Sequence, residues 1–120
     1  MKIVEKIRLL TVFVFLGFAA CQAQRAFNSS TWKQEAGKMS SDSVRSSMTA
    51  DLERRYPRGT PRSAIERALG PTEGAWSDIC AEKNADQCLF YYVGASGVDP
   101  VVYVIGFRNE RSVAYWKREL

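Results

Sequence analysis

Histidine is absent from the 120 residues of this chain, and only three cysteines occur. The commonest general base and a common metal ligand are therefore missing. The sequence also has no Cys-x-x-Cys pair, which is the usual redox motif. It has no glycine-rich loop that leads into a helix, which is the usual phosphate-binding motif. Its carboxylates are scattered at spacings typical of solvated faces. We therefore expect no enzyme activity, no metal site and no cofactor.

Long apolar runs are also scarce, apart from the stretch from Leu9 to Ala20. Lys2, Lys6 and Arg8 precede this stretch, and it is too short to span a bilayer as a helix. Basic residues, a short apolar run and small residues at its end form the pattern of an export signal. We expect residues 1–20 to be a signal peptide.

The end of this run, Ala19-Ala20-Cys21, resembles the lipobox of bacterial lipoproteins, with Phe18 where that motif usually has leucine. The resemblance implies that Cys21 receives the lipid and becomes the new N-terminus. Because Gln22 follows rather than aspartate, it implies an outer-membrane protein with its domain in the periplasm. The alternative is ordinary cleavage after Ala23, which would release a soluble periplasmic or secreted protein.

Lipidation of Cys21 would leave two cysteines, Cys80 and Cys88, in a polar connector. Disulfides persist in oxidising compartments, so we expect these two residues to pair. A zinc site is the alternative, but the chain has neither histidine nor a second cysteine pair to complete four ligands.

The expected export signal contributes about half of the net charge of +4. Of the 17 basic and 13 acidic residues, three and one respectively lie within residues 1–20, which leaves a charge near +2. This modest charge, together with export, argues against nucleic acid as a partner.

Residues 21–41 are rich in serine, glutamine, alanine and lysine and show little periodicity. This composition predicts a flexible tether, with a reach of about 25 Å. Phe27 and Trp32 do not suit a solvated linker; they either dock on the domain or a partner, or stay unstructured.

An apolar residue recurs at every fourth position from 44 to 52, which predicts a helix that begins near residue 42 and ends before Pro57. A second helix is expected between Thr60-Pro61, a good start signal, and Gly70-Pro71, a good stop. The two would form a helical hairpin.

The second half has runs rich in aromatic and β-branched residues at Cys88–Val93, Val101–Arg108 and Ser112–Arg118. Their short connections predict antiparallel strands, and Ala75–Ile79 is a candidate for a fourth. The expected fold class is α+β: a helical hairpin, then a three-stranded or four-stranded antiparallel β-meander, with the helices packed on one face of the sheet. The domain would span residues 42–120.

Both faces of this sheet are apolar. One alternating set is Leu89, Tyr91, Val93, Tyr103, Ile105, Phe107, Val113 and Tyr115. The other includes Phe90, Tyr92 and Trp116, which are candidate binding residues. Two short helices can cover only one face, and the pattern does not say which. We expect the other to be covered by Phe27 and Trp32, by a second copy in a homodimer, or by a partner protein.

Arg54, Arg55, Arg58 and Arg62 lie within nine residues around the turn of the helical hairpin. Guanidinium groups bind phosphates and carboxylates in a bidentate manner. These arginines are therefore candidates for contact with lipid phosphates, with peptidoglycan carboxylates or with an acidic partner. A simple solvated turn is the alternative.

The turns and strands resemble those of the SmpA/OmlA (BamE-like) small outer-membrane lipoproteins. The segments that carry the similarity are Tyr56-Pro57-Arg58-Gly59-Thr60-Pro61, Ala64-Ile65, Ala68-Leu69-Gly70-Pro71, Tyr91-Tyr92-Val93-Gly94 and Val104-Ile105-Gly106-Phe107. The similarity covers about residues 44–118. It implies a non-enzymatic binding or scaffold subunit, accessory to outer-membrane protein assembly, with a membrane anchor and a protein partner in the envelope. The alternative is a periplasmic inhibitor or immunity protein that binds a hydrolase through the aromatic sheet face or the Cys80–Cys88 loop.

Overall fold

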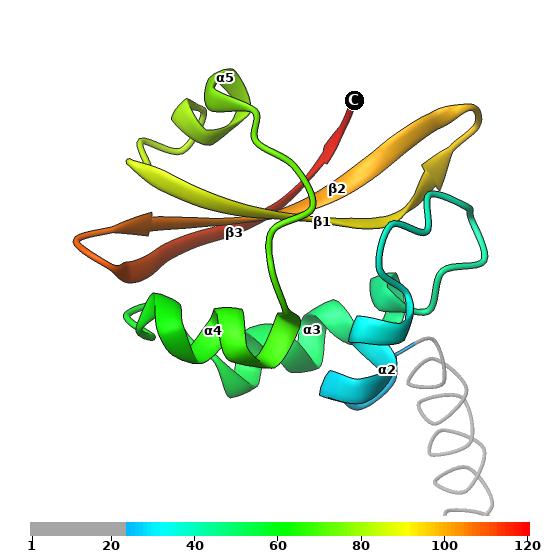
Figure 1. The fold of residues 1–120 in the computed structure, drawn as a ribbon, viewed down its shortest axis with the longest axis horizontal. Coiled ribbons are helices and arrows are strands. Elements are labelled where there is room, and N and C mark those ends of the chain that lie inside the picture. Colours follow the sequence, from blue (N-terminus) through cyan, green and yellow to red (C-terminus); the bar gives the residue numbers. More distant parts are fainter. Residues whose placement is uncertain (1–23) are drawn as a thin grey trace, which may run out of the picture.

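The computed structural model describes residues 24–120, which form four α-helices and a three-stranded antiparallel sheet (Figure 1). The helices are α2 (Ser29–Gln34), α3 (Arg45–Arg55), α4 (Arg62–Leu69) and α5 (Ser77–Ala81). The strands are β1 (Gln87–Ser96), β2 (Asp99–Arg108) and β3 (Arg111–Glu119). The α+β class is confirmed. The expected signal peptide, the lipidation site Cys21 and the alternative cut after Ala23 lie outside the described residues.

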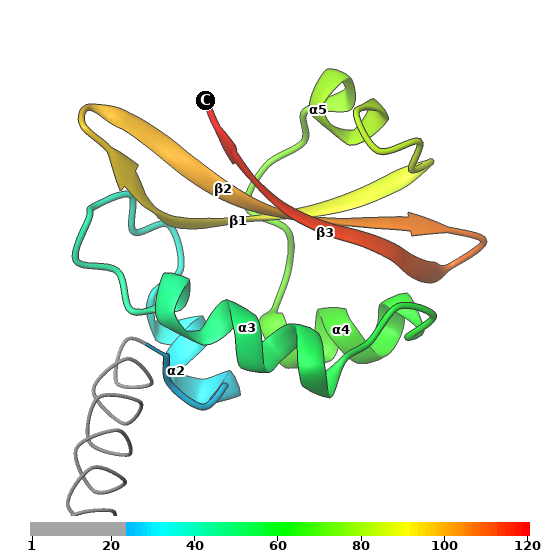
Figure 2. The ribbon, with the colours of Figure 1, turned by 180° about the vertical axis from the view of Figure 1, so that it is seen from behind.

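α3 and α4 form the predicted helical hairpin beneath one face of the sheet (Figures 1 and 2). α3 begins a little later than expected, at Arg45, and the N–H of the preceding Val44 donates to the side chain of Glu35 at 2.9 Å. α4 ends at Gly70, whose φ of 87° is a conformation that favours glycine.

The sheet is the predicted meander, in the order β1-β2-β3. β1 and β2 extend further than expected, through most of the loop predicted at residues 94–100, with a bulge between Tyr92 and Gly94. The β2–β3 turn consists of Asn109 and Glu110, both with positive φ (53° and 63°). Two such residues suit the right-handed twist of a two-residue hairpin.

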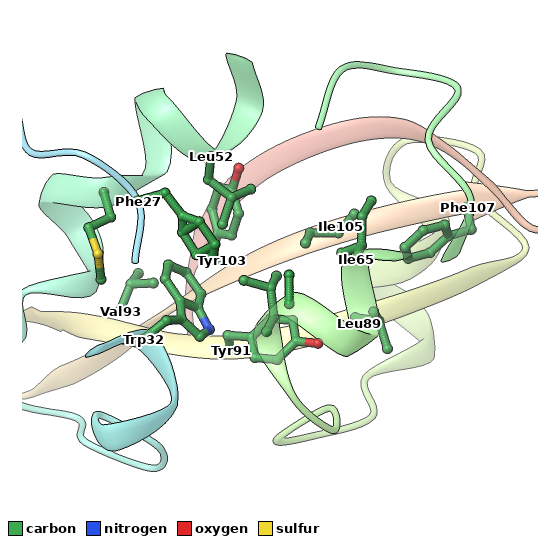
Figure 3. Packing of buried hydrophobic residues seen from close by; sticks show 13 residues of the cluster. Phe27, Trp32, Leu52, Ile65, Leu89, Tyr91, Val93, Tyr103, Ile105 and Phe107 are labelled. Atoms are coloured by element: carbon green, nitrogen blue, oxygen red, sulfur yellow. The ribbon is translucent and has the colours of Figure 1, made fainter. Parts of the chain in front are cut away.

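The main core lies between the sheet and the α2, α3 and α4 helices (Figure 3). Its buried members are Phe27, Trp32, Met48, Leu52, Ile65, Ala68, Leu69, Leu89, Tyr91, Val93, Tyr103, Ile105 and Phe107. The alternating set that begins at Leu89 thus faces the helical hairpin, with Tyr115 packed at its margin. Val113 is only half-buried, because a β-bulge places Ser112, rather than Val113, opposite Phe107.

The segment from residue 24 to 41 does not behave as the expected tether. Trp32 on α2 is fully buried, with its ring edge-on to those of Tyr91 and Tyr103 at centroid distances of 5.8 and 6.2 Å. Phe27 is 6% exposed, and Asn28 caps α2 by accepting a hydrogen bond from the Thr31 N–H at 2.9 Å. Burying two large aromatic side chains outweighs the polar composition of the segment, so this part belongs to the domain.

The second face of the sheet is covered by the chain itself. Residues 77–81 form α5 rather than a fourth strand, and α5 lies over this face (Figure 1). Ile79 and Cys80 pack there on Phe90, Val102 and Val104. The expectation that Phe27 and Trp32 cover this face is wrong, because both pack on the opposite face.

Candidate functional site

The Cys80–Cys88 disulfide is confirmed, with a Cα–Cα distance of 5.7 Å. It joins α5 to the start of β1 and so fastens the cover of the second sheet face. A cavity of about 310 Å³ lies beside it, with Trp76, Phe90 and both cysteines in its lining.

The aromatic candidates Phe90, Tyr92 and Trp116 are largely used by the fold. Phe90 is buried, and the ring of Trp76 meets it edge-on at a centroid distance of 5.1 Å. Tyr92 and Trp116 are half-buried and pack against the cluster that Ile79 and Cys80 of α5 form with the sheet. At Gly106 a Cβ atom would lie 3.1 Å from the ring of Trp116, so glycine leaves room for this ring on the sheet. This face therefore offers a partner less apolar surface than the sequence predicted.

The four candidate arginines do not form one cluster. Arg54 and Arg55 both pair with Asp51, and the Arg55 Nε lies 2.9 Å from its Oδ2. The same carboxylate accepts the backbone N–H of Phe27 at 2.6 Å. This hydrogen bond, with the two guanidinium groups, lowers the pKa of Asp51 below its ordinary value.

Arg58 and Arg62 lie further along, at the turn and on α4. Arg62 contacts Glu66 through its Nε at 3.3 Å and Gln87 through its Nη1 at 2.6 Å. Arg58 is exposed on the connection between α3 and α4.

The fold adds two arginines that the sequence did not single out. The β2–β3 turn packs against the α3–α4 connection, where the Gly59 N–H donates to the Ser112 carbonyl at 2.8 Å. This contact brings Arg108 and Arg111 to the same end of the domain, away from α2 (Figures 1 and 2). We call Arg58, Arg62, Arg108 and Arg111 the basic tip. Sequence reasoning predicted both turns but had no signal that they would meet.

The charges of the basic tip are poorly neutralised. Arg111 donates to the Gly59 carbonyl at 2.9 Å and Arg108 to the Asn84 carbonyl, which are neutral acceptors. Within residues 24–120, neither of these two arginines nor Arg58 forms an ion pair. Three exposed guanidinium groups thus remain available to an acidic ligand.

A buried ion pair, Arg45–Glu73, was not foreseen. Arg45 is fully buried, and its Nη1 and Nη2 atoms each lie 2.8 Å from a carboxylate oxygen of Glu73. The guanidinium also donates to the Trp32 carbonyl at 2.8 Å and stacks 4.8 Å from the centre of the Trp32 ring. Its donors are occupied by the protein, so we assign the pair a structural role. Nothing in the sequence distinguished Arg45 from a surface arginine.

No family model, curated protein or solved structure matches this chain. In the described part of the chain, the helices are too short or too polar to cross a membrane. The same residues contain no group of three or more side chains placed to hold a metal ion.

Proposed function

We propose that this chain is a non-enzymatic lipoprotein of the outer membrane, anchored through Cys21, whose domain serves as a binding or scaffold subunit. Its order, a helical hairpin followed by a β-meander, is the one expected from the sequence, and the turns and strands of that order carry the resemblance to BamE-like accessory proteins. The function would then be to hold a partner protein of the envelope, as those proteins do in outer-membrane protein assembly.

The observation that carries this proposal is the basic tip. Arginine is favoured at interfaces because it forms bidentate bonds to carboxylates and stacks on aromatic rings. Hydrogen bonds between the backbones of the two turns fix the positions from which these arginines project, so little backbone entropy is lost when a partner binds. A carboxylate-bearing surface on the partner is the ligand that this arrangement suits.

A hydrolase inhibitor has less support. That hypothesis used either the aromatic sheet face or the Cys80–Cys88 loop as its binding element. In the structure α5 lies over the aromatic face, and the disulfide fastens it there, so the loop, exposed at residues 81–84, is the element left to it.

Fractionation tests the anchor. The wild-type protein should be found with the outer membrane, and Cys21→Ser should move it to the soluble fraction. A wild-type protein that is soluble and begins at Gln24 would refute lipidation.

Charge reversal tests the binding surface. Arg58→Glu changes an exposed residue that has no ion-pair partner in the described chain, and Lys33→Glu is a matched reversal at an exposed site on α2, at the other end of the domain. In affinity capture from solubilised membranes, we expect wild type and Lys33→Glu to retain the same partner protein. Arg58→Glu should retain it at least several-fold less. Equal recovery by all three proteins would reject the basic tip.

A further inference from the structure

The chain is fixed to the domain almost from its first described residue. The Arg25 N–H donates to the Ser47 carbonyl at 2.9 Å, and the Phe27 N–H donates to Asp51 at 2.6 Å. The Phe27 side chain is buried in the main core. These contacts attach residues 25–27 to the side of α3, at the end of the domain where α2 lies (Figure 1).

This attachment sets a short limit on the distance to Cys21. Arg25 is four positions after Cys21, and four residue-to-residue steps of fully extended chain span at most about 14 Å. A flexible tether of twenty residues would have let the domain range over about 25 Å. A lipid on Cys21 therefore keeps this side of α3 close to the lipid headgroups.

A basic cleft lies on this side of α3. The cleft has a volume of about 320 Å³, lies between residues 24–26 and α3, and has Arg25 and Arg54 in its lining. The Arg54 side chain is 80% exposed and Arg25 is exposed. Asp51 also lines the cleft, but Arg54, Arg55 and the Phe27 N–H already bind its carboxylate. Two arginines against one carboxylate, with Arg55 alongside, leave the cleft positive.

We propose that this cleft docks on anionic lipid headgroups, so that the domain rests on the membrane and the basic tip is directed away from the anchor. The proposal rests on the lipidation of Cys21. An anchor a few residues away keeps the local concentration of headgroups high, so even weak arginine–phosphate contacts suffice to orient the domain. The same arrangement leaves the basic tip open to a protein partner.

The test uses the chain purified from membranes and placed in nanodiscs of phosphatidylethanolamine and phosphatidylglycerol that include a lipid with a paramagnetic headgroup. Amide relaxation should be enhanced at Ala26 and Ala50, beside the cleft, and not at Glu110 in the β2–β3 turn. Arg25→Gln should lower the ratio of docked to undocked domain about fivefold. The matched variant Lys83→Gln, at an exposed site on the α5–β1 connection and on the other side of the sheet from the cleft, should leave this ratio unchanged.

Each contrary result has a definite meaning. Equal relaxation at Ala26 and Glu110, equal effects of the two variants, or unchanged docking in phosphatidylcholine nanodiscs would overturn the docking alone. The mass of the same sample reads the anchor independently. A chain that begins at Gln24 without lipid would overturn both lipidation and docking. Binding of a protein partner by the basic tip would be unaffected by that result, because affinity capture measures it separately.

Discussion

At the scale of single residues, the buried contacts of Arg45 show how a charged side chain can organise a small core. The guanidinium links α2, α3, the segment before α5 and β1 through Trp32, Glu73 and the Tyr92 carbonyl. A buried ion pair is not in itself strong evidence for stability, but removal of one partner leaves a charge that is poorly solvated.

Arg45→Met should therefore cost about 3 to 5 kcal/mol in the free energy of unfolding, measured with urea. The double variant Arg45→Met/Glu73→Gln removes the remaining charge and should recover part of this loss. A double variant that is as unstable as the single one would show that the unpaired carboxylate is not the cause.

Asp51 gives the fold a dependence on pH. Its pKa is lowered in the folded state, so its contribution to stability is present above the unfolded value of about 3.9 and is lost as pH falls through the folded value. Asp51→Asn should lower the melting temperature at neutral pH, and the difference from wild type should shrink in acid. Asp99→Asn, at an exposed site, is the control. A deficit that persists unchanged in acid would contradict the role of the charge.

The interaction partners of individual residues were harder to predict from the sequence than which residues are buried. The alternation along β1 and β2 correctly separated the two apolar sets, because the side-chain period of a strand is fixed by its geometry. The ion pairs of Arg54 with Asp51 and of Arg62 with Glu66 join residues three and four apart on one helix, so their spacing could have predicted them. The meeting of Arg111 with Gly59, in contrast, depends on tertiary packing. No local pattern contains that information.

At the scale of elements, the start and stop signals of α3 and α4 were sufficient to predict the hairpin. Proline and glycine act locally on the backbone, so their effect can be read without knowing the fold. α2 and α5 were missed because each has only five or six residues. Helices of this length have little intrinsic stability and form through the contacts that they bury.

The contribution of α2 can be measured through Trp32. Trp32→Ala should destabilise the protein by about 3 to 5 kcal/mol, because it removes a fully buried aromatic side chain. We also expect proteolysis to cleave residues 24–34 in the variant before the rest of the domain. Trp76→Ala, on the half-buried second face, should cost less. Stability equal to wild type in Trp32→Ala would restore the tether hypothesis for this segment.

The contribution of α5 can be measured through the disulfide. Cys80→Ala/Cys88→Ala should lower the free energy of unfolding by about 2 to 3 kcal/mol, the value expected for a loop of this length. Freed from β1, α5 should expose Phe90 and its neighbours, so the variant should bind an apolar fluorescent dye more strongly. The wild-type protein under reducing conditions should behave like the variant. Dye binding equal to that of the oxidised wild type would indicate that α5 holds its place without the disulfide.

At the scale of the whole molecule, the domain has two different ends. The segment that leads from Cys21 is attached at the α2 end, while the basic tip lies at the opposite end, where the α3–α4 connection meets the β2–β3 turn (Figure 2). The proposed anchor at one end and the proposed binding surface at the other would suit a subunit that holds a partner near the membrane. Only the order of the elements could be predicted at this scale, since the arrangement of the two ends follows from contacts between distant segments.

The central claim is that the basic tip binds a protein partner in the envelope, and photo-crosslinking in living cells tests it most directly. A photoreactive amino acid at position 58 should give one dominant adduct with a protein, and the same amino acid at position 33, on α2 at the other end of the domain, should not. Adducts of the same pattern and intensity from both positions, or no protein adduct from position 58, would contradict the claim.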